Sequence, residues 1–426
     1  MSVVDPHQPS EGISDTSVQR LFLSLILLGL CLSGCRTVEE VRPIGAISAM
    51  LRTDPDLEVI ARRASDHRLQ ILVAEVVEAK GRIPAHLIRH DYRVDAEYFY
   101  PASSVKIYAA LAALEWFEES RLFEPRLTLS TPFCIQPLFE GEVLATEDST
   151  NLEGESITLE HEIRKLSLIS DNVAFDRLYG VVGHRALNAR AYRAGYSTVR
   201  INHRLGRRCT LEENLKSPVI TFGPAESPIL RIPERVSDLQ LQPRQIPGLE
   251  VGQARVDGEI RTDGPMDFSR KNAVSLRDLQ DALIALVRPD LIPQKPGYAI
   301  TDPTREVLIS AMRELPRQSE NPQLDQKEYP DHWGKFLLPG LREVIPDDEL
   351  EVTNKVGLAY GFTIENAYLY DRGTGRSLFI TACLYNNPNQ TLNDGVYGYE
   401  ETAFPFWQAL GTSVARRWLR PEEDQR

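Results

Sequence analysis

The stretch YPASSVKIYAALAALEWFEES, residues 100–120, is the part of this 426-residue sequence from which the fold is best inferred. It is rich in Ala and Leu and apolar on nearly every face, which is typical of a helix buried on all sides. Ser103 stands where this helix is expected to begin, so its oxygen lies near the positive end of the helix macrodipole. Lys106 follows three residues later and therefore shares a face with Ser103.

That spacing makes Ser103 a candidate nucleophile and Lys106 its candidate base. A lysine that is partly desolvated and beside other cations has a lowered pKa and can take the proton of a serine hydroxyl. The pattern S-x-x-K is common by chance, however, and by itself favours an ordinary helix start.

Two further short motifs follow in the chain. Ser170-Asp171-Asn172 lies between two predicted helices, where the Ser170 hydroxyl can relay a proton and the Asn172 amide can bind a substrate carbonyl. The same residue types also favour a helix N-cap. Lys355-Val356-Gly357 lies in a predicted strand, where a lysine can line a cleft and a glycine lets a substrate backbone approach closely. The plainer interpretation is a strand lysine whose amine is in water.

In this order the three motifs resemble the signature of class A β-lactamases and penicillin-binding proteins. The resemblance covers most of the chain from residue 56 onward. It implies that Ser103 attacks an amide or β-lactam carbonyl and forms an acyl-enzyme, with Lys106 as base or proton relay. Ser170 would pass the proton to the leaving nitrogen. Asn172 would orient the substrate, and Lys355 would steer it electrostatically.

The resemblance also implies an oxyanion hole, made by the backbone N–H groups of Ser103 and of Leu358, the residue after Gly357. The family usually has a hydroxyl residue at the position of Val356, where it helps to bind the substrate carboxylate. Since valine has no hydroxyl, carboxylate recognition departs from the pattern here.

A second departure concerns hydrolysis of the acyl-enzyme. Class A β-lactamases use a glutamate downstream of the second motif, and its expected position falls at about Leu205 or Gly206. Glu212 and Glu213 lie a little further on and are candidate general bases, and His203 is another. We therefore expect acylation at Ser103 with slow or no turnover of β-lactams.

The expected fold class is α/β (α+β), with an antiparallel sheet built from both chain ends, flanking helices and an inserted all-helical lobe. The α/β lobe would comprise residues 56–100 and 349–426, and the helical lobe residues 101–348. A segment at about 207–268, frequent in Pro and Gly, is interpreted as an insertion of loops. The predicted strands are residues 68–80, 91–100, 350–358, 362–370 and 377–385, and the last helix is residues 401–419.

The N-terminal segment indicates export. Arg20 precedes the apolar run LFLSLILLGLCL, and the next four residues, Leu32-Ser33-Gly34-Cys35, resemble a bacterial lipobox. Residues 1–35 are thus expected to be a lipoprotein signal peptide with Cys35 lipidated, and residues 36–55 a tether to the membrane. The protein would then lie in the bacterial cell envelope, outside the cytoplasm. The long acidic stretch before Arg20 is unusual for such a signal, and a buried helix or an uncleaved anchor is the alternative.

Composition and cysteine content exclude some other classes. The net charge of −13 argues against a nucleic-acid surface. The body cysteines Cys134, Cys209 and Cys383 are too few for a dense disulfide framework, although one bridge is possible. No CxxC pair or histidine cluster indicates a metal, and no cofactor is expected.

The expected partner is a β-lactam or a cell-wall-peptide-like small molecule, bound by a protein held at the membrane through its lipid. Two alternatives remain open at this point. The first is a cell-wall peptidase, an amidase or an esterase of the same fold. The second is a catalytically silent binding lipoprotein.

Overall fold

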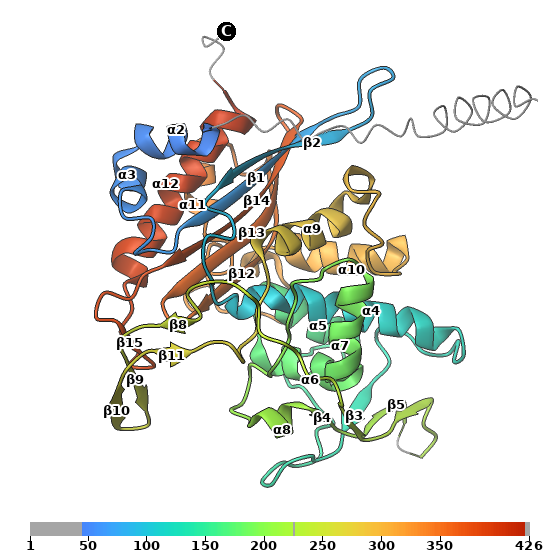
Figure 1. The fold of residues 1–426 in the computed structure, drawn as a ribbon. Helices are drawn as coiled ribbons and strands as arrows, with labels where there is room; N and C mark the ends of the chain where they lie inside the picture. The colour runs from blue at the N-terminus through green and yellow to red at the C-terminus, as the bar shows by residue number, and fades with distance from the viewer. Residues whose placement is uncertain (1–44, 225, 422–426) are drawn as a thin grey trace, which may run out of the picture. The chain divides into compact units, whose positions relative to one another are not determined.

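A five-stranded antiparallel sheet is the centre of the structure, a computed structural model that describes residues 45–224 and 226–421 (Figure 1). Its strand order is β12–β13–β14–β1–β2, so strands from both parts of the chain meet where β1 pairs with β14 and Val73 lies opposite Ile380. This arrangement confirms the expected fold class. The strands are β1 (Gln70–Val77), β2 (His86–Tyr92), β12 (Leu350–Ala359), β13 (Phe362–Asp371) and β14 (Arg376–Tyr385).

The predicted strand over residues 91–100 is wrong, because the second strand is β2 and ends at Tyr92. β2 begins soon after β1, and Val77 lies opposite His86 in a short hairpin. Arg93 and Asp95 follow with φ values of 53° and 61°. These left-handed conformations end the extended backbone.

One face of the sheet is covered by helices from the two ends of the described chain (Figure 1). Alternate residues of β14, such as Leu378 and Ile380, pack into this layer, while Phe379 points to the other face. The helices of this layer are α2 (Ala46–Thr53), α3 (Pro55–Ala61), α11 (Leu338–Arg342) and α12 (Phe404–Val414), with the turns η4 (Tyr399–Ala403) and η5 (Ala415–Leu419) on either side of α12.

Helix α2 corrects the prediction that residues 36–55 form a tether. Its residues Ile47, Met50 and Leu51 are buried in the core between the helices and the sheet. The described chain is therefore packed against the sheet from α2 onward. The predicted signal peptide and Cys35 lie outside the described residues.

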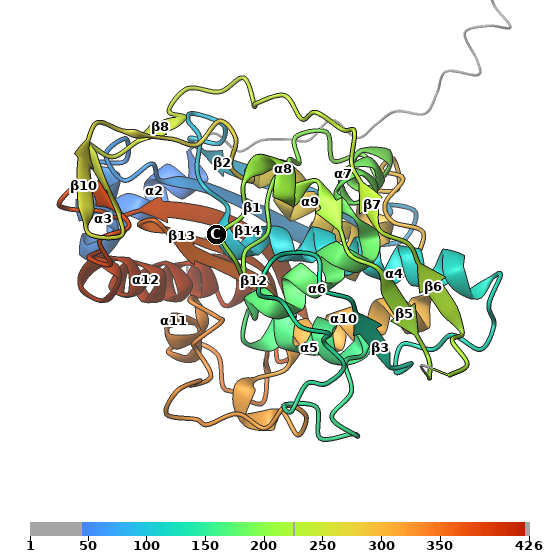
Figure 2. The same ribbon diagram turned by 90° about the horizontal axis from the view of Figure 1, so that it is seen from below.

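The other face of the sheet is covered by the helices of the middle of the chain (Figure 2). Among them α9 packs directly on β1, β13 and β14. The helices are α4 (Lys106–Arg121), α5 (Leu159–Leu168), α6 (Asn172–Val182), α7 (His184–Arg193), α9 (Leu276–Val287) and α10 (Asp302–Arg313), with the short turns η1 (Ala102–Val105), η2 (Pro289–Leu291) and η3 (Pro316–Gln318).

The segment 207–268 contains one short helix and several short strands. Two of its strands pair with strands outside the segment, since β5 pairs with β3 (Phe133–Ile135) and β9 pairs with β15 (Thr391–Leu392). Its elements are α8 (Leu211–Asn214), β4 (Lys216–Ser217), β5 (Ile220–Phe222), β6 (Leu230–Ile232), β7 (Arg235–Val236), β8 (Glu250–Val251), β9 (Ala254–Asp257), β10 (Ile260–Asp263) and β11 (Met266–Asp267).

Among the described residues, the cysteines of the body form no bridge. Cys134 and Cys209 are half-buried thiols, and Cys383 is buried in β14. Within residues 45–224 and 226–421, no helix is long and apolar enough to cross a membrane, and no cluster of side chains could hold a metal ion.

Candidate active site

Ser103 lies in the short turn η1, directly before α4. Its side chain is half-buried and lines a cleft of about 960 Å³. Ser104 differs, because it is fully buried and its hydroxyl donates to the carbonyl of Pro101 at 2.7 Å. Of the two neighbouring serines, only Ser103 is therefore available to a ligand.

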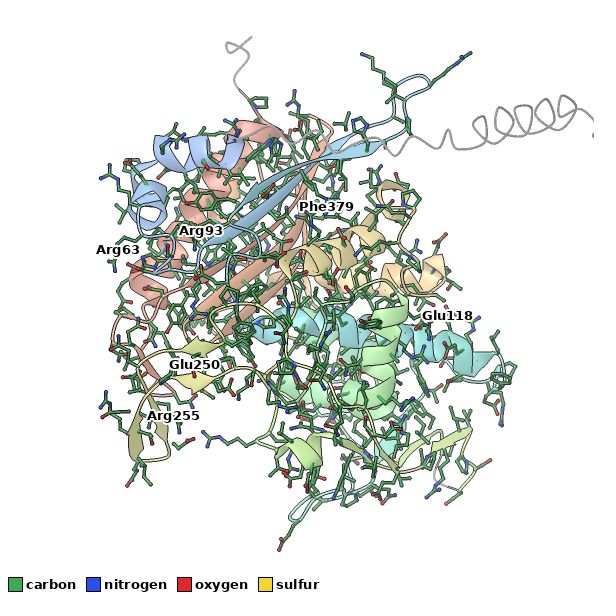
Figure 3. The ribbon with its side chains drawn as sticks, in the orientation of Figure 1. Arg63, Arg93, Glu118, Glu250, Arg255 and Phe379 are labelled. Carbon is green, nitrogen blue, oxygen red and sulfur yellow. The ribbon has the colours of Figure 1, made fainter. Side chains whose placement is uncertain are left out.

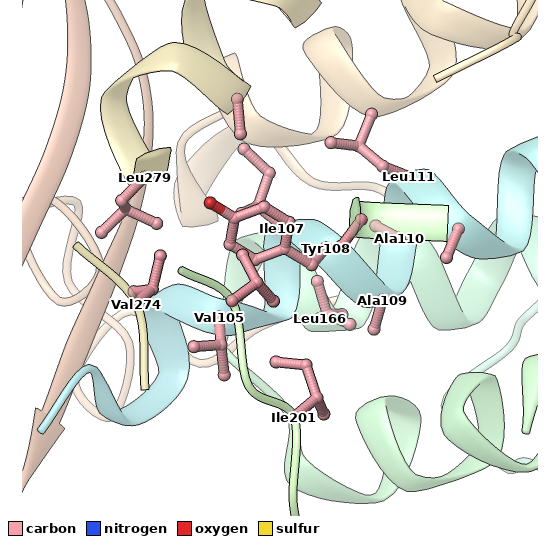
Figure 4. Close-up of a cluster of buried hydrophobic side chains, with 14 of the residues drawn as sticks. Val105, Ile107, Tyr108, Ala109, Ala110, Leu111, Leu166, Ile201, Val274 and Leu279 are labelled. Carbon is pink, nitrogen blue, oxygen red and sulfur yellow. The ribbon is translucent and has the colours of Figure 1, made fainter. Parts of the chain in front are cut away.

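Helix α4 holds Lys106 rigidly at its first position. The helix is surrounded by apolar side chains, with Leu166, Val274 and Leu279 from neighbouring segments packed around it (Figure 4). This burial agrees with the apolar residues on nearly every face of its sequence. Lys106 itself is fully buried, so its amine cannot turn towards water.

The amine of Lys106 contacts the second motif. It donates to the backbone carbonyl of Ser170 and to Asn172 Oδ1 at 2.7 Å, and it lies 3.3 Å from Ser170 Oγ. Asp171 instead caps α6, where its carboxylate accepts the N–H of Ala174 at 2.7 Å. The motif is therefore both a helix cap and part of the candidate site. Asp171 caps α6, while Ser170 and Asn172 face Lys106.

Lys355 reaches the same hydroxyl from the sheet. It is buried on β12, and its Nζ donates to Ser170 Oγ at 2.8 Å. The interpretation of Lys355 as a solvated strand residue is therefore wrong. Ser170 Oγ lies between two amines, one from α4 and one from the edge strand of the sheet.

Burial and mutual repulsion disfavour two charged lysines at this point. Burial lowers the pKa of Lys106 well below its usual value, and the charge of Lys355 lowers it further. Burial also lowers the pKa of Lys355 to about 7, against the attraction of Glu365. The site therefore favours a neutral Lys106 beside a Lys355 that changes charge near neutral pH.

A buried polar network behind Lys355 was missed in the sequence. Glu365 on β13 is fully buried and accepts the N–H of Phe336 at 2.7 Å and the amide of Asn354 at 2.5 Å. Asn354 Oδ1 in turn accepts from the amine of Lys335 at 2.8 Å. Burial raises the pKa of Glu365 to about 7. A glutamate within the apolar strand FTIENAYLYD was the available signal.

Gly357 is the point where β12 touches η1. A Cβ atom at this position would lie 2.4 Å from the carbonyl oxygen of Pro101 and 3.0 Å from the N–H of Ser104. The close neighbour of this glycine is thus the chain itself, beside Ser103. Glycine here allows the edge strand to lie against the turn that carries the serine.

Residues on either side of Gly357 point in different directions. Leu358 is 41% exposed and lines the cleft together with Ser103. Val356 packs into the core on the far face of the sheet, beneath α11 and α12. The side chain at position 356 therefore faces away from the cleft.

Leu205 and Gly206 line the cleft where the resemblance places the deacylating glutamate. Their backbone N–H groups donate to the carboxylate of Asp176 on α6, at 2.8 and 3.1 Å. Burial raises the pKa of Asp176 to about 6. Both of its oxygens are occupied by these backbone groups, so Asp176 fixes the segment against α6.

Glu212 and Glu213 do not line the cleft. Glu212 is exposed to solvent on α8. Glu213 forms a capping box with Thr210, whose N–H it accepts at 2.7 Å. The structure therefore does not bring the two candidate bases to Ser103, because their short helix directs them outward.

His203 lines the cleft and packs parallel to the ring of Tyr100 at 6.4 Å between centroids. Its Nδ1 lies 2.6 Å from the carbonyl oxygen of Arg204, so Nδ1 carries the proton and donates. Burial lowers the pKa of His203 to about 4, so the ring is neutral at neutral pH. Its Nε2 is buried with no hydrogen-bond partner in the described part of the chain.

Comparison with known proteins agrees with the motifs. A family model described as the beta-lactamase enzyme family matches residues 90–396, which is well over half of the chain. The protein belongs to this family. No curated protein matches the sequence.

Solved structures that match include three β-lactamases. One is a β-lactamase from Desulfarculus baarsii DSM 2075, with 17% identity and a TM-score of 0.46, covering 87% of this chain and 97% of that one. A class A β-lactamase from Mycobacterium abscessus has 16% identity and a TM-score of 0.44, covering 84% and 97%. A β-lactamase from Burkholderia ambifaria has 15% identity and a TM-score of 0.46, covering 84% and 97%.

Proposed function

We propose that this protein is a serine hydrolase of the β-lactamase type that forms an acyl-enzyme on Ser103 with an amide or β-lactam substrate. The observation that carries the proposal is the hydroxyl of Ser170, which lies between the amines of Lys106 and Lys355. Asn172, which also contacts Lys106, lines the same cleft as Ser103. Such an arrangement provides a base, a proton relay and a positive charge, and Ser103, three residues before Lys106, is the nucleophile that we propose they serve.

In the proposed reaction, the neutral amine of Lys106 takes the proton of Ser103 as its Oγ attacks the carbonyl carbon. The carbonyl oxygen becomes an oxyanion, which accepts the N–H groups of Ser103 and Leu358. Ser170 Oγ then passes a proton to the leaving nitrogen and regains one from the lysines. The C–N bond breaks, and the acyl group stays on Ser103.

We further propose that the acyl-enzyme is hydrolysed slowly. Leu205 has no group that can activate water, and the carboxylate of Asp176 is occupied by backbone N–H groups. Installing a carboxylate at the cleft should therefore accelerate the second step.

The experiment is intact-mass analysis of the protein after brief and long incubation with benzylpenicillin. We expect an adduct that is absent in Ser103→Ala and that persists in the wild type. Leu205→Glu should shorten the lifetime of this adduct by about tenfold or more, within the range of general base catalysis. Glu212→Gln, a matched carboxylate change outside the cleft, should leave the lifetime unchanged.

An adduct that forms equally in Ser103→Ala would contradict the proposed nucleophile. Rapid hydrolysis by the wild type would contradict slow deacylation. No adduct and no consumption of penicillin would overturn β-lactam acylation and favour another acyl substrate, or binding alone.

We also propose that Cys35 carries a lipid and holds the protein outside the cytoplasm, on the evidence of the sequence Leu32-Ser33-Gly34-Cys35. Metabolic labelling with palmitate should then depend on this cysteine. Label that survives in Cys35→Ser would contradict the anchor.

A further inference from the structure

The cleft that Ser103 lines carries two cations that have no carboxylate partner among the described residues. Lys271 and Arg270 both line the cleft, close to the end of the 207–268 segment. Lys271 is half-buried, and its Nζ contacts the hydroxyl of Tyr360 at 3.4 Å and lies 5.4 Å from the centre of that ring. Arg270 is exposed and forms no hydrogen bond or ion pair with another residue in the described ranges.

The other arginines of the cleft are already engaged. Arg204 donates to the backbone carbonyls of Lys216 and Glu213, and Arg207 pairs with Glu142. Arg208 lies 3.8 Å from the carboxylate of Asp257 on β9. These guanidinium groups hold the segment together. Figure 3 shows the side chains of this region, with Arg255 labelled on β9.

The acidic residues of the cleft leave the two cations unpaired. The carboxylate of Asp257 is turned to Arg208, and that of Asp267 accepts the N–H and the hydroxyl of Ser269, each at 2.7 Å. Neither forms an ion pair with Lys271 or Arg270 among the described residues. In a chain of net charge −13, this is a local excess of positive charge in the cleft that Ser103 lines.

Lys271 is held in place by its surroundings. Its backbone N–H donates to the carbonyl of Phe268 at 3.0 Å, and its carbonyl accepts the amide of Asn202 at 2.8 Å. The ring of Tyr360 packs edge-on against Phe268 and Tyr100, at 5.4 and 5.2 Å between centroids. The ammonium is therefore positioned before a substrate arrives, which lowers the cost of binding.

The order of residues along β12 shows which part of a substrate would meet this ammonium. In the proposed reaction, the leaving nitrogen of the substrate lies on the side of Lys355. The carbonyl oxygen of the substrate lies at the N–H of Leu358. Tyr360, which contacts Lys271, follows directly after the strand. Leu358 follows Lys355 by three residues, or about 10 Å at a rise of about 3.4 Å per residue, and Tyr360 lies in the turn that follows β12. The acyl part of a substrate therefore extends from Ser103 towards Lys271.

We infer that Lys271 and Arg270 bind a carboxylate on the acyl part of the substrate, so that the preferred substrates are amides or β-lactams with an anionic acyl side chain. This inference rests on the proposed acylation of Ser103. The ammonium and guanidinium donate charge-assisted hydrogen bonds to the carboxylate, and the half-buried position of Lys271 limits competition from water.

The test uses a matched pair of penicillins. Carbenicillin differs from benzylpenicillin by one added carboxylate on the acyl side chain, and both carry the same ring carboxylate. The rate constant for acylation of Ser103 is measured for each by intact mass. We expect carbenicillin to acylate the wild type about tenfold faster, which corresponds to about 1.4 kcal/mol.

The double variant Lys271→Gln, Arg270→Gln should lose this preference, so that its acylation rates with carbenicillin and benzylpenicillin become equal. Lys271→Arg, in the presence of Arg270, should keep the preference, and Lys327→Gln, an exposed lysine outside the cleft, should behave as the wild type. Thermal unfolding of each variant verifies that it is folded.

The outcomes separate the two proposals. Equal acylation of the wild type by both penicillins, or a preference that survives in the double variant, would overturn the anionic acyl subsite while leaving Ser103 as the nucleophile. Acylation by neither penicillin would overturn the proposed function and the subsite that depends on it.

Discussion

Ser170 is the residue that joins the sheet and the helices of the site. Its Oγ accepts from the amine of Lys355 at 2.8 Å, and its backbone carbonyl accepts from Lys106. Its own backbone is left-handed, with a φ of 55°. A hydroxyl between two amines can pass a proton without moving far, so in the proposed reaction the charge state of the two lysines sets the rate.

The charge of Lys355 gives a prediction about pH. Lys355 is charged below its pKa of about 7 and neutral above it, so acylation should fall as the pH rises through 7. Glu365 favours the charged form, and Glu365→Gln should lower the pKa of Lys355. The fall in rate should then move to lower pH, which the pH profile of acylation by benzylpenicillin measures.

Glu75→Gln is the control for this variant, because Glu75 lies on β1 away from the two lysines. It should leave the profile unchanged. If the acylation rate falls at the same pH in Glu365→Gln and in the wild type, Glu365 does not set the pKa of Lys355.

Individual site residues could be predicted where the motif itself has a spacing rule. Ser103 and Lys106 are three residues apart on one face, and their proximity to the second motif follows from its known order in the family. Glu365 and Lys271 could not be predicted in this way, because their importance arises from what folds against them. Glu212 and Glu213 were misjudged for the same reason, since Glu212 is exposed and the carboxylate of Glu213 is engaged in a capping box.

The contact between β12 and η1 is the element-scale feature on which the site depends. Gly357→Ala would place a methyl group 2.4 Å from the carbonyl of Pro101. The strand and the turn must then separate, at a cost of about 1–3 kcal/mol for an overpacked core. We expect a lower unfolding temperature and slower acylation of Ser103, because Ser103 and Leu358 move apart.

Gly180→Ala is a matched substitution within α6. A Cβ atom there would meet Pro218 at 3.4 Å, an ordinary contact, and alanine favours a helix. This variant should be at least as stable as the wild type. If Ser103 of Gly357→Ala is acylated at the wild-type rate, the close contact between β12 and η1 does not position the serine.

Long elements were predicted better than short ones. The three strands of the C-terminal part and the buried helix α4 are confirmed, because each has a clear pattern of buried side chains. The strand predicted at residues 91–100 failed where two residues adopt a left-handed backbone that the pattern did not show. The strands of the 207–268 segment are two to four residues long, too short for a period to be recognised.

At the scale of the whole unit, helix α2 gives a prediction about where the stable folded unit must begin. A chain that begins at Asp54 lacks Ile47, Met50 and Leu51, which are buried against the sheet layer. Each buried side chain of this size contributes about 1.5–3 kcal/mol, a large share of a typical stability of about 5–15 kcal/mol. We expect a markedly lower midpoint of thermal unfolding than for a chain that begins at residue 42.

Equal midpoints for the two chains would show that α2 contributes nothing to the core. The sequence could not give this boundary, because residues 36–55 look polar beside the apolar run that precedes them. The fold class, by contrast, followed from strands at both ends of a helical middle. How the 207–268 segment attaches, through β3 and β15, depends on pairings between distant segments that no local pattern encodes.

The pairing of β1 with β14 also sets a time at which the sheet can be completed. The ribosome makes β1 and β2 early, whereas β14 appears only in the last part of the chain. At about 5–20 residues per second, the wait is roughly 15–60 s. During this time the edge of β1 that later pairs with β14 is open to pairing with other chains. Translation products that stop before residue 376 can never close that edge, so they are the forms of this protein that we expect to aggregate.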